Sequence, residues 1–330
     1  MSHEVDLKDK PVHTDLAIEL TESEYKIDSD GIKVTEIKLD EKKAQIIGKK
    51  KGTYITIEFT DITDYDNRQK VKTIFKEELK KILKDVKKDS TFLIIGLGNE
   101  KSTPDSLGPL TISKITVTNH LYIYGSLDEN YRRVSAIAPG VTGQTGIETV
   151  ELIKAITKSS KPDFVIVIDA LAAQSVERVN KTIQMTDAGI NPGSGIGNKR
   201  KEISKEVLNI PVIAIGVPTV VDAASIVSDT INYMYSHFAY QKDTYNSPKS
   251  KLTVNANYLK YNSKIQKKDK ENLLGIVGTL SEDEIKQLLY EILNPIGYNM
   301  MVTPKEEDFT VDKLSELISE GINEALQKKE

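Results

Sequence analysis

The sequence of 330 residues contains no cysteine, no tryptophan and only four histidines. Without cysteine the chain can form no disulfide, no thiolate nucleophile and no cysteine-based metal site. No two of the histidines have the close spacing of a helical metal site; they are His3, His13, His120 and His237. Any catalytic or metal-binding chemistry therefore has to rely mainly on carboxylates.

Long apolar runs and an excess of one charge are also missing. No stretch has the length that spans a bilayer, and the first ten residues lack the charged-then-apolar order of a signal peptide. The formal net charge of -4 argues against a surface built mainly to bind nucleic acid. With 38% hydrophobic residues the chain can still bury a substantial core. We therefore expect a soluble, cytoplasmic protein that contacts neither membrane nor nucleic acid directly.

The sequence does contain unbroken apolar runs that alternate with segments whose apolar residues recur at helical spacing. Unbroken apolar runs at 92–95, 164–168 and 212–217 are typical of strands covered on both faces. Helical stripes separate or follow these runs, at 107–121, 145–157 and 223–235. This alternation predicts an α/β fold with a mostly parallel central sheet, flanking helices and right-handed crossovers, and a core at about 90–238.

The segments around this core have their own patterns. Alternating apolar and polar residues at 32–39 and 54–59 predict an N-terminal antiparallel hairpin. Residues from about 240 to 270 are rich in lysine, asparagine and serine, which predicts a weakly ordered polar insertion. We expect a mainly helical C-terminal part over 271–330, with a short strand near 298–302.

Two glycine-rich segments invite a nucleotide-binding interpretation. Gly96 and Gly98 begin like a dinucleotide fingerprint, but Lys101 stands where the third glycine would be, so a tight turn is the favoured interpretation. The second segment, 193–200, could cradle an anion through backbone N–H groups, although it lacks the order of a Walker loop. Ser194 within it lacks the Gly-x-Ser-x-Gly context of a serine hydrolase. We expect this segment to be a flexible loop that borders a site.

Two aspartates follow the ends of buried strands. Asp105 lies in the loop after 92–95, and Asp169 directly follows 164–168. If the two strands are neighbours, the side chains can converge at the carboxyl edge of the sheet. One carboxyl would then keep a proton and donate to the scissile carbonyl, while the other activates a water. The alternative is structural, with Asp105 capping a helix that starts near Ser106 and Asp169 capping one after Ala170.

Longer segments of the chain resemble the germination protease family of spore-forming bacteria. They are 96–99, 103–109, 138–141, 168–173, 191–195, 216–222, 274–280 and 301–305, so the resemblance covers nearly the whole chain. The family's two catalytic aspartates fall on Asp105 and Asp169, which implies an aspartic-type endopeptidase with no cofactor or metal. The matched loops supply candidate substrate contacts: Gly98, Asn99, Gly140, Gly193, Ser194 and Gly195.

The resemblance also implies a precursor and a substrate. The family degrades the small acid-soluble proteins that coat spore DNA, in the spore core during germination, and its members are homotetramers made as self-processing zymogens. The segment 13–17 resembles the processing site, which places the cleavage between Asp15 and Leu16. Residues 1–15 would then be a propeptide and 16–330 a single protease domain. The tail could act as a tethered pseudo-substrate because its effective concentration is high.

Two other functions remain open at this stage. The family's fold is similar to that of hydrogenase-maturation proteases, which use carboxylates and a histidine around a metal, so a metal-dependent endopeptidase is one alternative. In either mechanism Asp222 could serve as a further acid. The other alternative is a non-catalytic, anion-binding regulatory module built on 193–199.

Overall fold

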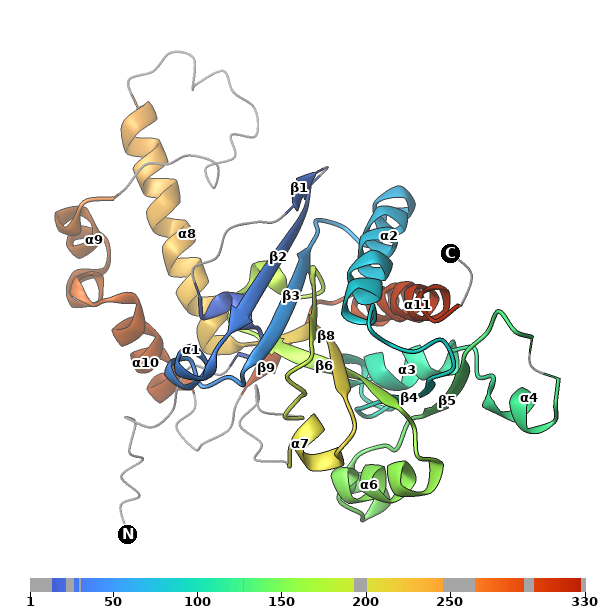
Figure 1. The fold of residues 1–330 in the computed structure, drawn as a ribbon. Coiled ribbons are helices and arrows are strands. Elements are labelled where there is room, and N and C mark those ends of the chain that lie inside the picture. The colour runs from blue at the N-terminus through green and yellow to red at the C-terminus, as the bar shows by residue number, and fades with distance from the viewer. Residues whose placement is uncertain are drawn as a thin grey trace, which may run out of the picture. The chain divides into compact units, whose positions relative to one another are not determined.

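The computed structural model describes residues 14–21, 27–29, 31–126, 128–192, 201–245, 265–293 and 300–327 (Figure 1). By backbone proximity the chain divides into two compact units. The larger consists of Val12–Val220 with Thr303–Glu330, and the smaller of Val221–Val302 with Met1–Pro11. In the part of the chain that is described, no helix is both long and apolar enough to cross a membrane.

The larger unit is built on one sheet whose strands follow the order β1-β2-β3-β7-β8-β6-β4-β5. The strands are β1 (Ile27–Ser29), β2 (Ile32–Leu39), β3 (Gly52–Glu58), β4 (Thr91–Gly96), β5 (Arg133–Ile137), β6 (Phe164–Ala173), β7 (Thr182–Thr186) and β8 (Val212–Asp222). Strand β4 pairs in parallel with both β5 and β6. The expected α/β fold with a parallel region and flanking helices is confirmed.

The parallel half of the sheet consists of β4, β5 and β6. Its central strand is covered by apolar side chains on both faces, as the unbroken runs predict. Phe92 and Ile94 face the cluster formed with α3 (Leu107–Ser113) and α11 (Glu307–Ala325). Leu93 and Ile95 face a second cluster that includes α6 (Thr149–Ser160) and the region of α7 (Lys205–Leu208). Because alternate residues are covered on opposite faces, this half has no solvated face.

The antiparallel half of the sheet includes β2, β3 and β7, and its two faces differ. Val34 on β2 packs in the cluster that contains α2 (Tyr65–Ile82) and α11. The next residue, Thr35, points to the other face, and the register aligns it with Thr56 on β3 and then Gln184 on β7. The expected N-terminal hairpin is therefore confirmed as β2 and β3, but it joins the main sheet through β7, and its connection contains the short helix α1 (Glu41–Ile46).

Two elements differ from the sequence-based expectation. The single helix expected at 107–121 is broken into α3 and α4 (Asn119–Ile123). Helix α3 ends at Ser113, and Thr118, the N-cap of α4, anchors the break: its backbone N–H donates to Val134 O at 3.0 Å and its hydroxyl to Arg132 O at 2.5 Å. Strand β6 does not end near Asp169 but continues to Ala173.

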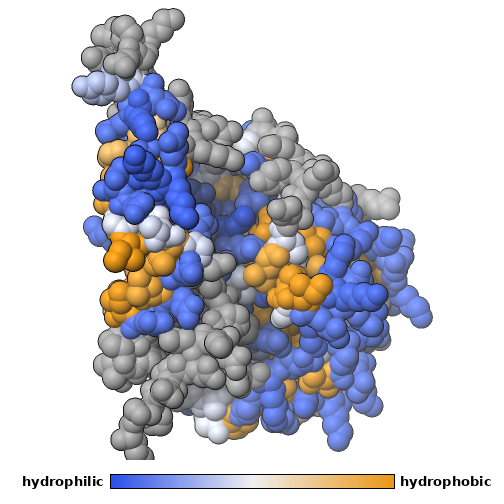
Figure 2. Space-filling model, turned by 90° about the vertical axis from the view of Figure 1, so that its left-hand side faces the viewer, coloured by the Kyte–Doolittle hydropathy of each residue, from blue (hydrophilic) through white to orange (hydrophobic). Residues whose placement is uncertain are grey.

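The smaller unit contains mainly helices. They are α8 (Ala223–Thr244), α9 (Lys267–Leu274) and α10 (Glu282–Leu293), with a 3₁₀ segment at Gly275–Thr279 and the short strand β9 (Met301–Val302). Helix α8 extends past the expected end at residue 235, with Ala239 buried, and Lys242 pairs with Asp269 of α9 at 2.7 Å. The positions 240–244 and 267–270 of the expected polar insertion are thus helical, and 246–264 lie outside the described residues. Figure 2 shows apolar side chains gathered in separate patches on an otherwise hydrophilic face of the molecule.

Candidate active site

Asp105 is held at the end of β4 by a close backbone approach. It ends the 3₁₀ segment Thr103–Asp105, and its carbonyl accepts the N–H of Asn99 at 2.9 Å. A Cβ built on Gly98 would lie 2.0 Å from that carbonyl oxygen, and Gly98 has a φ of +113°. Only glycine fits both conditions, so the turn that ended the strand in the sequence also fixes the position of Asp105.

Asp169 lies within β6 and is 5% exposed. The structural alternative, in which it caps a helix after Ala170, is wrong because the strand continues for four more residues. Its Oδ1 accepts the N–H of Ala170 at 3.0 Å. For α3 the N-cap is Ser106, without a side-chain capping bond.

The two aspartates lie at the carboxyl edge of hydrogen-bonded neighbours. Gly96 is aligned with Ile168, the residue before Asp169, and Leu97 N–H donates to Ile168 O at 2.8 Å. The carboxylate of Asp105 is beside Gly98, two residues past the end of β4. A third strand contributes from β8, where the Thr219 hydroxyl donates to Pro104 O at 2.6 Å. Asp169 therefore directly follows the last residue of β6 that is paired with β4, and Asp105 lies in the loop after β4; the catalytic role of the two stays a prediction.

Two of the expected loop contacts meet at this edge. The side-chain amide of Gln144, in the short helix α5 (Thr142–Thr145), donates to Asn99 Oδ1. Gly140 immediately precedes that turn, and a Cβ on it would lie 2.9 Å from Gln144 Oε1. The loops after β4 and β5 are thereby joined by a residue that the sequence did not single out. Gly193, Ser194 and Gly195 lie outside the described residues.

The bond expected to be processed, between Asp15 and Leu16, is docked against β6. Asp15 N–H donates to Ala172 O at 3.0 Å, and the Asp15 side chain accepts Ala172 N–H at 2.9 Å. Ala172 is three residues beyond Asp169, about 10 Å along an extended strand. Leu16 and Ala17 are 0% exposed, so this segment is packed into the protein.

Three polar residues that sequence reasoning missed hold this segment. Gln184 brackets the bond, with Nε2 donating to Asp15 O at 3.1 Å and Oε1 accepting Ala17 N–H at 2.8 Å. Lys49 donates to Thr14 O at 2.7 Å, and burial lowers the pKa of its amine. Burial likewise raises the pKa of Glu19, against the opposing effect of its hydrogen bonds and of Arg178. No local signal in the sequence singles out Gln184, because it is one of three polar residues that alternate with Ile183 and Met185 in 182–186.

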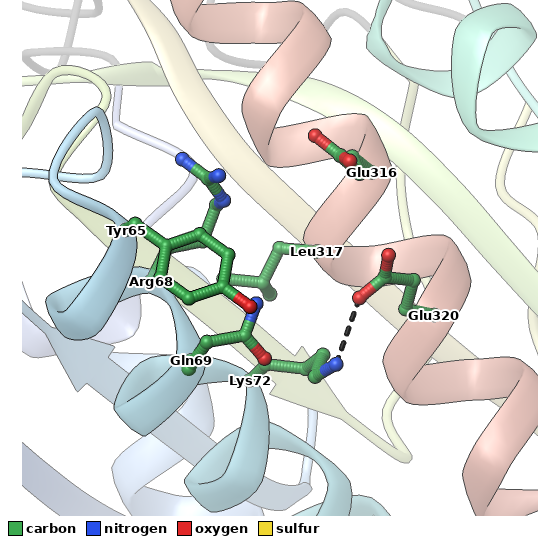
Figure 3. A pocket seen from close by; sticks show the side chains of 7 residues that line it. All are labelled: Tyr65, Arg68, Gln69, Lys72, Glu316, Leu317 and Glu320. Carbon is green, nitrogen blue, oxygen red and sulfur yellow. Dashed lines mark hydrogen bonds and ion pairs between the residues drawn. The ribbon is translucent and has the colours of Figure 1, made fainter.

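The sequence also offered Asp222 as a further acid, and it belongs to the smaller unit. Asp222 begins α8, where its Oδ1 caps the helix by accepting Ala224 N–H at 2.7 Å. Among the residues that the structure describes, no group of three or more His, Asp and Glu is arranged to hold a metal ion. A surface hollow of about 200 Å³ lies between α2 and α11 (Figure 3). It is lined by Tyr65, Arg68, Gln69, Lys72, Glu316, Leu317 and Glu320, with Lys72 paired to Glu320 at 2.8 Å, and it contains neither aspartate of the pair.

Comparison with known proteins identifies one family. The sequence profile described as germination protease matches residues 2–330. A germination protease of Geobacillus sp. (strain WCH70) is 45% identical over 361 residues, covering 100% of this chain and 97% of the relative. That of Bacillus subtilis (strain 168) is 44% identical over 353 residues, covering 99% and 96%.

Among solved structures, a NiFe hydrogenase maturation protease from Thermococcus kodakarensis KOD1 matches 43% of this chain and 80% of its own. The identity is 18% and the TM-score 0.28, a likeness too small to support an argument about mechanism. The sequence relationship, by contrast, extends over essentially the whole of both proteins. The chain therefore belongs to the germination protease family and is a protease.

Proposed function

We propose that this protein is a self-processing endopeptidase that hydrolyses small acid-soluble, DNA-binding spore proteins by a two-aspartate mechanism. The observation that supports the proposal is that Asp169 on β6 and the loop of Asp105 after β4 both follow the point where the parallel pairing of these two strands ends. Catalytic groups of α/β proteins collect at this edge. Family membership supplies the second support.

The proposed chemistry uses one ionised and one protonated carboxyl group. Two carboxylates held close together do not both ionise readily, so one keeps a proton near neutral pH. The ionised group takes a proton from the attacking water, and the protonated group donates to the carbonyl oxygen of the scissile bond. When the carbon–nitrogen bond breaks, the proton held by the base passes to the leaving amine. The reaction consumes one water and needs no cofactor.

The same pair is proposed to act on the chain itself. Hydrolysis between Asp15 and Leu16 removes residues 1–15 and leaves 16–330 as the protease domain. The docking of this segment against the strand that carries Asp169 supports the assignment. Cleavage after an acidic residue followed by a large apolar and a small residue also defines the sequence we expect in substrates.

The setting of the reaction follows from the family. We propose that the enzyme acts in the spore core as a homotetramer, with the spore proteins as its substrates. A formal net charge of -4 is consistent with an enzyme that recognises the protein and leaves the DNA to its substrate.

Substitution of each aspartate tests the mechanism. We expect Asp105→Asn and Asp169→Asn each to lower the cleavage rate of a peptide containing Asp-Leu-Ala by at least about 100-fold, because an amide can neither accept nor supply the catalytic proton. Asp85→Asn, at an exposed position of the same unit, is the matched control. Full activity in either catalytic variant excludes the pair. Activity lost to a chelator and restored by metal assigns a metalloprotease instead.

N-terminal sequencing of the processed chain tests the cleavage position. We expect Leu16 as the first residue, and processing to stop in both aspartate variants. Any other first residue refutes the assigned bond.

A further inference from the structure

The bond proposed for processing is placed so that its hydrolysis creates a charge inside the protein. Leu16 and Ala17 are fully buried, and Ala17 N–H is held by Gln184. Hydrolysis adds one water across the bond, leaving a carboxylate on Asp15 and an ammonium on Leu16. An unpaired ammonium in such a place costs several kcal/mol unless a carboxylate and hydrogen-bond acceptors surround it.

A carboxylate is already connected to the Leu16 nitrogen through one side chain. Leu16 N–H donates to the Thr14 hydroxyl at 3.0 Å, and the same hydroxyl donates to Glu19 Oε2. Two hydrogen bonds in sequence span at most about 6 Å. Thr14 belongs to the part that leaves after hydrolysis, so its departure removes the link and leaves the new ammonium within that distance of Glu19.

Glu19 also holds the chain directly after β6. Its Oε2 accepts Gln174 N–H at 2.9 Å and its Oε1 accepts Ser175 N–H at 3.2 Å. These residues immediately follow the strand that carries Asp169, and the helical segment Ala17–Glu19 connects them to the new terminus. The partner of Glu19 can therefore influence how firmly the end of this strand is held.

The charges around Glu19 change when the propeptide leaves. Arg178, in the 3₁₀ segment Val176–Arg178, lies 3.5 Å from Oε1 through Nε and donates to Glu58 of β3 at 2.6 Å. Lys49 interacts electrostatically with both Asp15 and Glu19. Loss of Asp15 removes a negative charge that Lys49 also faces. Glu19 then has three cationic neighbours, which are Arg178, Lys49 and the new ammonium of Leu16.

We propose that Glu19 is a positioning residue, which takes the Leu16 ammonium as its partner in place of the Thr14 hydroxyl and so fixes the end of β6 in the processed enzyme. This inference rests on the proposed cleavage between Asp15 and Leu16. In the unprocessed chain burial raises the pKa of Glu19. An ammonium beside it favours the ionised form, and the carboxylate in turn favours the protonated amine.

The test produces the Leu16 terminus without self-processing. A fusion partner is attached directly before Leu16 and removed, after folding, by a protease that leaves no residue of its own. The α-amine is then labelled near pH 7 with an amine reagent, and the rate is followed by mass spectrometry. The comparison includes Glu19→Gln, a chain with one extra glycine before Leu16, and, as the control, Glu177→Gln at an exposed position of the segment Val176–Arg178.

We expect labelling to be about tenfold slower in the Leu16 chain than in Glu19→Gln, because each unit of pKa increase lowers the unprotonated fraction about tenfold. The unfolded α-amine has a pKa of about 7.7–8.0. Pairing with Glu19 raises the pKa of this amine in the folded protein. The stability that the pair adds is therefore fully present below the unfolded pKa and is lost as pH rises through the higher folded pKa. Glu19→Gln and the glycine extension should abolish this pH dependence, and Glu177→Gln should keep it.

The activity profile separates positioning from general stabilisation. Cleavage of the Asp-Leu-Ala peptide by the Leu16 chain should fall as the amine loses its proton, and the glycine-extended chain should lack this alkaline limb. Equal labelling rates in the Leu16 chain and Glu19→Gln overturn the proposal. If Glu19→Gln does not fold, the glycine extension decides alone, since it keeps Glu19. Labelling needs no proteolytic activity. An inactive enzyme would therefore refute the proposed function, while the labelling rates would still test the role of Glu19.

Discussion

The two halves of the central sheet are stabilised in different ways. In the parallel half, alternate residues such as Leu93 and Ile94 are buried in apolar clusters on opposite faces. In the antiparallel half, Val34 lies in the same apolar cluster as Ile94, whereas its neighbour Thr35 lies on the face that carries Gln184. The N-terminal segment contacts β2 and is held by Gln184 on this half, and Asp15 also exchanges hydrogen bonds with Ala172 near the end of β6.

This difference suits the two tasks proposed for the sheet. Apolar packing on both faces gives the aspartates a rigid support, because close-packed cores yield little. Hydrogen bonds and buried charges exchange more readily with water, since a protein hydrogen bond adds only about 1 kcal/mol net. The segment proposed to be cut combines buried Leu16 and Ala17 with many polar contacts, whereas the strands proposed to support catalysis are packed mainly by apolar side chains.

The largest loss of stability and activity is expected at the turn after β4, which holds the loop of Asp105. Gly98→Ala places a Cβ 2.0 Å from Asp105 O at a φ of +113°. We expect a loss of about 3 kcal/mol in the free energy of unfolding and a fall in peptide cleavage, since the loop of Asp105 must move. Gly143→Ala is the control, because a Cβ there meets nothing within 4 Å. A Gly98→Ala enzyme with unchanged stability and activity would show that this edge is not rigid.

A smaller, reciprocal effect should distinguish the two faces of the antiparallel half. Val34→Thr inserts a hydroxyl into the apolar cluster and should cost about 1–3 kcal/mol. Thr35→Val removes a buried hydroxyl that has no hydrogen-bond partner among the described residues, and should add up to about 1 kcal/mol. Denaturant unfolding of both variants measures the two changes in the free energy of unfolding. Equal destabilisation by both would contradict the assignment of unlike faces.

The smallest effect is a pH dependence at the N-terminal segment. Burial raises the pKa of Glu19 above 4.5, so its contribution to stability is fully present below that pH and is lost as pH rises through the folded value. Hydrogen-exchange protection of Leu16 and Ala17 in the full-length chain should fall over this range, after correction for intrinsic exchange. Protection of Val167 should stay constant, and Glu19→Gln should remove the dependence at Leu16. A parallel change at Val167 would mean that the whole protein responds.

The parallel half could be predicted from the sequence because its signals are local. Runs such as 92–95 and 164–168 mark buried strands, although β6 continues past Asp169 to Ala173. The strands that carry or precede Asp105 and Asp169 are neighbours, as the prediction of a catalytic pair requires. The helix at 107–121 was misjudged because a tertiary contact, from Thr118 to Val134, outweighed its apolar periodicity.

The contacts of the N-terminal segment could not be predicted in this way. Gln184 is separated by 167 positions from the Ala17 that it binds, and no periodicity relates the two. Glu19 lies in an N-terminal segment without apolar periodicity, yet its side chain is almost completely buried beside Arg178. Such contacts depend on which face of the sheet the tail covers, and local pattern carries no information about that choice.

The burial of Leu16 has a consequence for the kinetic order of the proposed processing. Because this residue is inaccessible and Asp15 is bound through both backbone and side chain, the segment must open before water and a catalytic pair reach the bond. Opening is an event within one molecule. Whenever it is the slow step, the half-time of processing is the same in dilute and in concentrated solution, whichever copy of the enzyme then makes the cut.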